Sequence, residues 1–77
     1  MTPDDLRNVG EAAYGPRWQR ELARDLSIGD RLVRRWVAGD RPMPADLADR
    51  LDAVVIARIT VLVRTRRGLQ QLRKKAA

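Results

Sequence analysis

Two residue types that carry much of protein chemistry are missing from this chain of 77 residues, which contains no cysteine and no histidine. Their absence excludes disulfides, the usual zinc ligands and nucleophiles activated by histidine. Acid–base chemistry would have to come from carboxylates, arginines or the single tyrosine. We therefore expect no enzyme: no catalytic residue, no metal site, no cofactor and no small-molecule ligand.

The chain is also short. A domain of this length buries only about 60% of the surface that its unfolded chain exposes, so its stability alone is marginal. With disulfides and the usual zinc ligands excluded, a second subunit is the favoured source of additional stability. We expect one compact domain that forms a homodimer.

Long hydrophobic runs are scarce. The longest, AVVIARITVLV, is interrupted by Arg58 and is too short to span a bilayer. The N-terminal MTPDDL is acidic and has no apolar core, so we expect no signal peptide. The formal net charge of +6 favours a polyanionic partner, either nucleic acid or an anionic membrane surface. A soluble, intracellular protein is expected.

Proline and glycine divide the chain into four or five predicted helices, which indicates an all-α fold. The first is expected to begin after the N-cap Thr2 and to end before Gly15, and the second spans residues 16–26. The third covers residues 30–38 and is closed by Gly39. Trp18 and Trp36 lie on apolar stripes of the second and third helices, so both are expected in the core.

A last segment begins at Pro44, and Gly68 is expected to end or kink it. One side should cover the first three helices, through Leu47, Leu51, Val54, Val55, Leu62 and Leu69. The apolar arc is wider than one contact needs, so a neighbouring side should meet a second copy. The predicted dimer interface comprises Ile56, Ile59, Leu62 and Val63.

Two features of this segment leave alternatives open. Residues 53–63 are rich in β-branched side chains, so a strand there remains an alternative to a helix. Arg58 lies on the same side as Leu51 and Leu62, and should either reach solvent or find an acidic partner, such as Asp52 or a residue of another subunit.

The stretch QRELARDLSIGDRLVRRWVAG, residues 19–39, resembles the helix-turn-helix of the lambda-repressor and Cro-like superfamily of phage and bacterial regulators. The positions that match that pattern are Gln19, Leu22, Ala23, Leu26, Ile28, Val33, Trp36 and Gly39. Two positions depart from it: Ser27 replaces the usual turn glycine, and Gly29 replaces the usual serine N-cap. We expect Ser27 either to strain a left-handed position or to reshape the turn.

The resemblance implies a small regulator of the phage or mobile-element type, located with the nucleoid in the bacterial cytoplasm. It implies a homodimeric repressor that binds an inverted-repeat operator in double-stranded DNA through the major groove. Residues 1–43 would then hold the N-terminal helix and the DNA-binding region. Residues 44–77 would complete the core, form the dimer and end in a basic tail.

Within this plan, the face of the third helix opposite its core stripe should read the bases, because arginine paired with guanine is the commonest specific contact. The expected base contacts are Asp30, Arg31, Arg34 and Arg35. The expected phosphate contacts are Arg17, Gln19 and Arg41. The alternative for these charges is an ordinary solvated face.

Two other functions compete with DNA binding. A helical dimer with a basic surface could bind an acidic protein, as an antitoxin-like or inhibitor module does. RNA binding is less well supported, because Tyr14 is the single candidate for base stacking.

Overall fold

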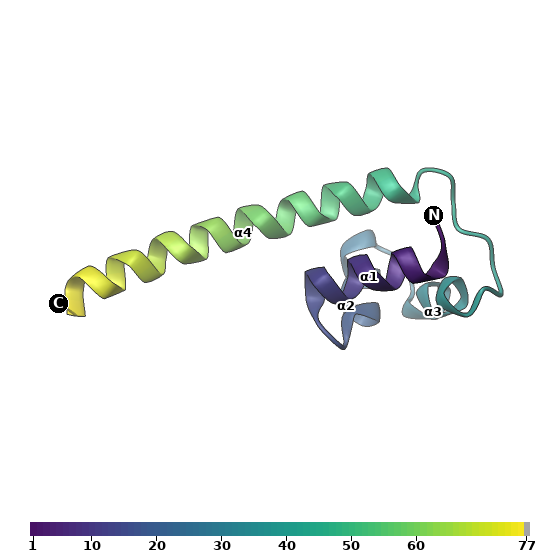
Figure 1. The fold of residues 1–77 in the computed structure, drawn as a ribbon, viewed down its shortest axis with the longest axis horizontal. Coiled ribbons are helices and arrows are strands. Elements are labelled where there is room, and N and C mark those ends of the chain that lie inside the picture. Colours follow the sequence, from purple (N-terminus) through teal and green to yellow (C-terminus); the bar gives the residue numbers. More distant parts are fainter. Residues whose placement is uncertain (77) are drawn as a thin grey trace.

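The computed structural model describes residues 1–76, which form four helices and no strand. They are α1 (Pro3–Tyr14), α2 (Trp18–Leu26), α3 (Asp30–Ala38) and α4 (Leu47–Ala76). The first three pack into a globule beside the start of α4, and the rest of α4 projects away from it (Figure 1). The molecule therefore measures 54 × 21 × 20 Å. The all-α prediction is confirmed.

The ends of α1 follow from its sequence. The Asp5 backbone N–H donates to Oγ1 of Thr2 at 3.1 Å, and the Thr2 backbone N–H donates to Oδ2 of Asp5 at 2.7 Å. This reciprocal pair satisfies two of the free N–H groups at the start of the helix. The hydrogen bond from the Thr2 backbone also lowers the pKa of the Asp5 carboxyl. At the other end, Gly15 adopts a φ of 87° and α1 stops at Tyr14, as predicted.

The turn between α2 and α3 spans residues 27–29. Ser27 occupies the left-handed region, with φ 58° and ψ 42°, so the first of the two expectations for this residue is confirmed. The Ile28 N–H donates to the carbonyl of Ala23 at 2.9 Å and closes the end of α2. Gly29 is the N-cap of α3 and supplies no side-chain hydrogen bond. The turn thus combines a strained residue with a weak cap.

The core joins all four helices. Val33 and Trp36 of α3 belong to the same buried cluster as the apolar residues of α2 and as Leu47 and Leu51 of α4, and both tryptophans are buried, as predicted. The buried hydrophobic side chains of the described chain are Leu6, Trp18, Leu22, Ala23, Leu26, Val33, Trp36, Leu47 and Leu51.

Gly10, in the middle of α1, allows the close approach of α1 and α2. A Cβ atom at this position would overlap the Cε3 and Cδ2 atoms of the Trp18 indole ring. The indole therefore lies directly against the α1 backbone, and the cost of a glycine inside a helix is offset by this packing. The sequence pattern placed Trp18 in the core and did not reveal its dependence on Gly10.

The fourth helix has the expected secondary structure but differs from the sequence-based expectation in its extent and its contacts. It is helical throughout residues 53–63, as expected, so the strand alternative is wrong, and it continues through Gly68, so the predicted end of the helix there is also wrong. Its backbone lies close to α1 and α2 but, over residues 1–76, not to α3. From Ile59 onward every described side chain is exposed, because α4 has left the globule.

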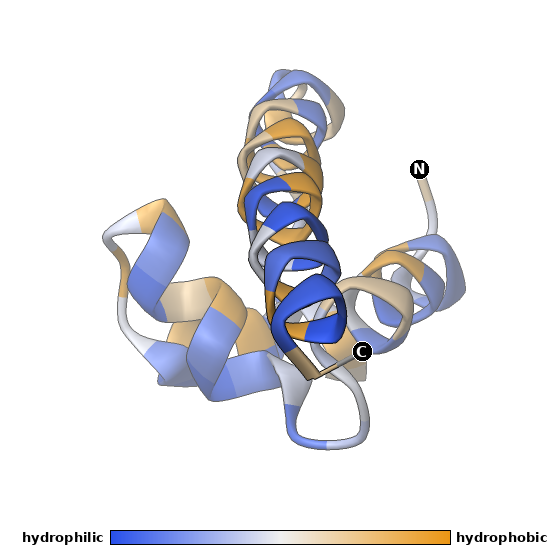
Figure 2. Cartoon of the chain, turned by 90° about the vertical axis from the view of Figure 1, so that its left-hand side faces the viewer, coloured by the Kyte–Doolittle hydropathy of each residue, from blue (hydrophilic) through white to orange (hydrophobic). Residues whose placement is uncertain are grey.

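Because α4 leaves the globule, the residues of α4 that were predicted to cover the first three helices are not all buried. Leu47 and Leu51 are buried, and Val54 and Val55 are half-buried. Leu62 and Leu69, by contrast, are 60% and 54% exposed, so their predicted role in the core is wrong. Figure 2 shows the hydrophobic colour continuing along the middle of α4, beyond the part that packs on the globule.

The last contact between α4 and the globule involves Arg58. Its guanidinium carbon lies 4.9 Å from the centre of the Tyr14 ring. The Tyr14 hydroxyl in turn donates to Oδ2 of Asp25 at 2.6 Å, which links α1, α2 and α4. Arg58 thus finds an aromatic face rather than the expected solvent or acidic partner, and Tyr14 is engaged inside the fold. Burial raises the pKa of the Tyr14 phenol, and the bond to Asp25 raises it further.

Candidate nucleic-acid interface

The exposed face of α3 is defined by its buried face. Val33 and Trp36 are held in the core, and successive residues of a helix are rotated by about 100°. Arg31, Arg34 and Arg35 consequently lie on the opposite side, and all three side chains are exposed. α3 therefore presents three guanidinium groups, each with several hydrogen-bond donors and a permanent charge.

Asp30 modifies this basic face at its N-terminal end. Its Oδ2 lies 3.5 Å from Nη2 of Arg34, one turn further along α3. The pair is solvent-exposed and contributes only about 0.3–0.5 kcal/mol to stability. Its main effect is to hold the Arg34 side chain near the start of α3. The Asp30 carboxylate also interacts favourably with the positive end of the helix dipole there.

A shallow open hollow of about 360 Å³ lies between the N-terminal ends of α2 and α3. It brings together two residues predicted for phosphates, Arg17 and Gln19, and two predicted for bases, Asp30 and Arg34. Arg20 also lines the hollow, although it is not among the residues predicted from the sequence. Its three-residue spacing from Arg17, which places both on one side of the chain entering α2, was the available signal.

The remaining predicted contacts lie outside this hollow. Arg31 and Arg35 are exposed on α3, and Arg41 is exposed in the connection between α3 and α4. Arg17 is the N-cap of α2 and makes no side-chain capping bond, so the first N–H groups of α2 remain available as donors. A phosphate at that position would meet both these donors and the Arg17 guanidinium.

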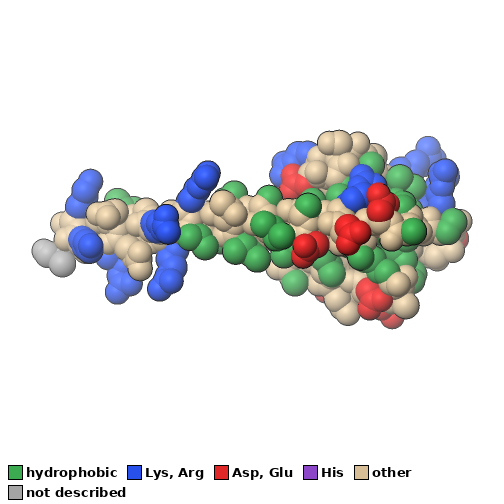
Figure 3. Space-filling view, turned by 90° about the horizontal axis from the view of Figure 1, so that it is seen from above, with side chains coloured by type: hydrophobic (Ala, Val, Ile, Leu, Met, Phe, Trp, Pro, Cys, Tyr) green, Lys and Arg blue, Asp and Glu red, His purple; other side chains and the backbone are tan. Residues whose placement is uncertain are grey.

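The predicted dimer residues lie on a different part of the molecule. Ile56, Ile59, Leu62 and Val63 are between 46% and 60% exposed on α4. Seen along the top of the molecule, hydrophobic side chains occupy the middle of α4, and basic side chains gather at its far end (Figure 3). The candidate interface on α3 and the apolar part of α4 are therefore separate surfaces.

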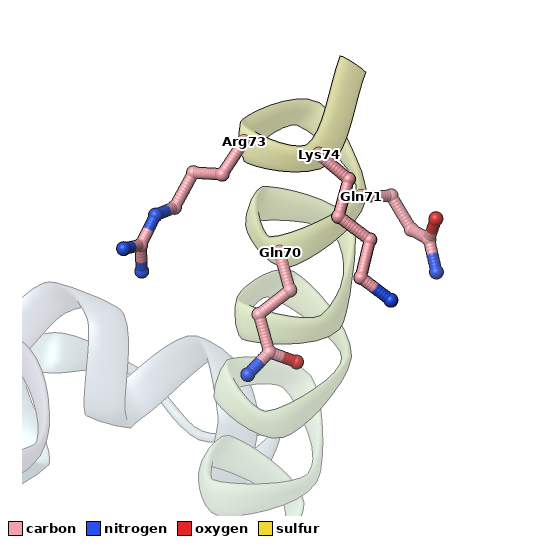
Figure 4. Close-up of a pocket in the computed structure, with 4 residues that line it drawn as sticks. All are labelled: Gln70, Gln71, Arg73 and Lys74. Atoms are coloured by element: carbon pink, nitrogen blue, oxygen red, sulfur yellow. The ribbon is translucent and has the colours of Figure 1, made fainter. Parts of the chain in front are cut away.

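The far end of α4 has no shaped site of its own. Gln70, Gln71, Arg73 and Lys74 surround an open space beside the last turns, and Figure 4 shows their side chains spreading from one helix in different directions. Among residues 1–76, no group of three acidic side chains lies close enough to hold a metal ion. No helix in the same part of the chain is long and apolar enough to cross a membrane.

Comparisons with family models, with curated proteins and with solved structures give no match to this chain. The function is therefore inferred from the side chains themselves and from their arrangement on α2 and α3.

Proposed function

We propose that this chain is a sequence-specific DNA-binding regulator that acts as a homodimeric repressor in the bacterial cytoplasm. The supporting observation is the hollow that joins Arg17 and Gln19 of the α2 entrance to Asp30 and Arg34 of α3. Recognition of a duplex requires both kinds of contact at once, with phosphates fixing the position and base edges giving the sequence preference.

In the proposed complex, the exposed face of α3 enters the major groove, which is about 12 Å wide and admits a helix. Arg31 and Arg34 donate to guanine edges, and Asp30 accepts from a cytosine amino group or continues to orient Arg34. Arg17, Gln19 and the first N–H groups of α2 bind the flanking phosphates. Arg35 and Arg41 extend the contact on either side.

Two such units related by a two-fold axis would match an inverted repeat whose half-site centres lie about 10 bp apart, or a multiple of that. Binding of this kind represses transcription when the operator overlaps a promoter, because the bound dimer and the polymerase occupy the same DNA.

Selection of bound sites from a random duplex library tests the proposal. We expect an inverted repeat, and we expect Arg34→Ala to relax the preference at one base position in each half-site. Arg17→Ala should weaken binding to all sequences alike and reduce the slope of log affinity against log salt by about 1. Arg7→Ala is the matched control, because it removes the same charge from α1, outside the hollow.

Two results would contradict the proposal. An unbiased selected pool would exclude sequence-specific recognition, and equal effects of Arg34→Ala and Arg7→Ala would exclude base reading by α3. The competing function, a module that binds an acidic protein, predicts little affinity for duplex DNA at physiological salt.

A further inference from the structure

Charge is divided sharply along the chain. All ten acidic residues lie within residues 1–52, among nearly as many basic residues. In the rest of the chain every charged residue is basic: Arg58, Arg64, Arg66, Arg67, Arg73, Lys74 and Lys75. Figure 3 shows this division, with acidic side chains over the globule and none along the projecting half of α4, residues 59–76.

A mainly apolar groove of about 370 Å³ runs between α1 and the start of α4. Val9, Leu51 and Val55 contribute apolar side chains to it, and the carboxylates of Asp5 and Asp52 lie along it. Asp52 has no ion-pair partner among the described residues. The groove thus offers apolar surface together with negative charge.

Beyond the groove, its apolar surface continues along one side of α4, where no other element flanks the helix. At about 100° per residue, Val55, Ile59, Leu62 and Leu69 lie within an arc of roughly 80° on one side of the helix. Beyond Arg58, no described element covers this arc. Its exposed Ile and Leu side chains continue the apolar surface of the groove.

We infer that the projecting half of α4 from a second copy lies antiparallel in this groove. Only that half of the chain combines exposed leucines with basic and no acidic residues, so it complements the groove in both polarity and charge. With the two-fold axis between Ile59 and Thr60, Ile56 lies opposite Val63 of the partner. The same register places Asp52 opposite Arg67 of the partner.

The antiparallel direction follows from charge. Parallel helices would place the basic residues 64–75 of one copy against the same residues of the other, which like-charge repulsion disfavours. Antiparallel helices instead place them beside Asp46, which directly precedes α4, and beside Asp49 and Asp52 in the first turns of α4. Residues 47–72 then overlap over about 39 Å of helix.

This arrangement also specifies the relation between the two globules. The face that meets the partner comprises Leu62, Ile59, Val63 and Ile56, spans about 120° centred on Ile59, and lies roughly 100° around α4 from the arc that packs on α1 and α2. A two-fold axis perpendicular to the two α4 axes then keeps both globules on the same side of the pair. Two globules on the same side of the pair suit two contacts with one duplex, and in this respect alone the inference rests on the proposed function.

Disulfide cross-linking tests the direction directly, because the natural chain has no cysteine. Ile56→Cys and Val63→Cys variants should form a disulfide when mixed and oxidised, and neither should cross-link with itself. In the antiparallel register, two copies of position 56 lie about 10 Å apart along the helices, beyond the reach of a disulfide. Asp40→Cys, in the exposed loop after α3, is the control that should stay uncross-linked in every mixture.

A charge exchange tests the inferred pairing of Asp52 with the partner's Arg67. Asp52→Arg should raise the dimer dissociation constant about tenfold, and Arg67→Asp in the same chain should restore it. Asp40→Arg makes the same charge change outside α4 and should leave the constant unchanged. Sedimentation equilibrium measures the constant, and circular dichroism verifies that each variant is helical.

Disulfides within a single variant, a wild-type chain that stays monomeric at about 100 µM, or no restoration by Arg67→Asp would each overturn the inference. Its failure is separable from failure of the proposed function. A chain that selects a DNA sequence without the mixed disulfide overturns the pairing alone. A chain that forms the mixed disulfide and selects no sequence supports the pairing and overturns the function.

Discussion

The globule and the projecting half of α4 use the same apolar residue types in opposite surroundings. Leu47 is completely buried in the core cluster, whereas Leu69, on the same helix, is 54% exposed. Every acidic residue of the chain lies within residues 1–52, and the projecting half contains none. Burial of an apolar residue on α4 therefore depends on which element lies within reach, and the exposed apolar residues of the projecting half are typical of a surface that binds a partner.

The first pair of variants compares one leucine from each region and should give the largest difference in stability. Leu47→Ala should lower the free energy of unfolding by about 2–5 kcal/mol, because it leaves a cavity in the core. Leu69→Ala should leave it within about 0.5 kcal/mol at concentrations where the chain is monomeric. Urea denaturation followed by tryptophan fluorescence measures both. Similar losses in the two variants would show that the regions do not differ in this way.

A second pair of variants compares glycines. Gly10→Ala should lower the free energy of unfolding by about 1–3 kcal/mol, because the added methyl group overlaps the Trp18 ring. Gly68→Ala adds the same group to open space inside α4 and should raise helix stability by about 0.5–1 kcal/mol. Thermal unfolding monitored by circular dichroism reports both changes. A stabilising Gly10→Ala would be incompatible with the observed packing of Trp18.

The third prediction tests whether the globule keeps a local strain at its candidate interface. Ser27→Gly should raise the free energy of unfolding by about 0.5–1 kcal/mol, because glycine adopts the left-handed conformation without a Cβ penalty. Ser27→Ala keeps the Cβ atom and should not produce this gain. If both variants stabilise the chain equally, backbone strain at Ser27 is not the cause.

The smallest effect concerns the junction of the two regions. Because the pKa of Tyr14 is raised in the folded chain, its unfolded form ionises first as the pH rises above about 10. The stability that Tyr14 contributes is therefore complete below pH 10 and declines above it. Tyr14→Phe keeps the ring beneath Arg58 and should flatten this decline in pH-dependent unfolding curves. An unchanged pH profile would exclude Tyr14 as its source.

The sequence predicted those features that depend on neighbours along the chain. The bounds of α3, the Thr2 cap and the burial of both tryptophans follow from capping residues and helical spacing, which act within a few turns. The resemblance to a helix-turn-helix selected Arg17, Gln19, Asp30 and Arg34 as contacts, and the structure places all four around one hollow. Arg20 was missed because an arginine at that position is equally typical of a solvated face.

The features that could not be predicted depend on distant parts of the chain. Periodicity placed Leu62 and Leu69 on one side of α4 but does not reveal where the globule ends beneath it. Gly68 does not interrupt α4, because one interior glycine costs only about 1 kcal/mol. Arg58 and Tyr14 are 44 positions apart, and no local pattern indicates that they meet.

The buried and the exposed apolar residues occupy successive parts of the chain, which determines the order in which they are synthesised. Every buried side chain of the described protein lies between Leu6 and Leu51, and, apart from Met1, the large exposed apolar residues begin at Ile56. Because chains emerge from the ribosome N-terminus first, the buried set is synthesised before the exposed set. The residues that form the core are therefore synthesised before the exposed isoleucines, valines and leucines of residues 56–72, which could otherwise compete for it.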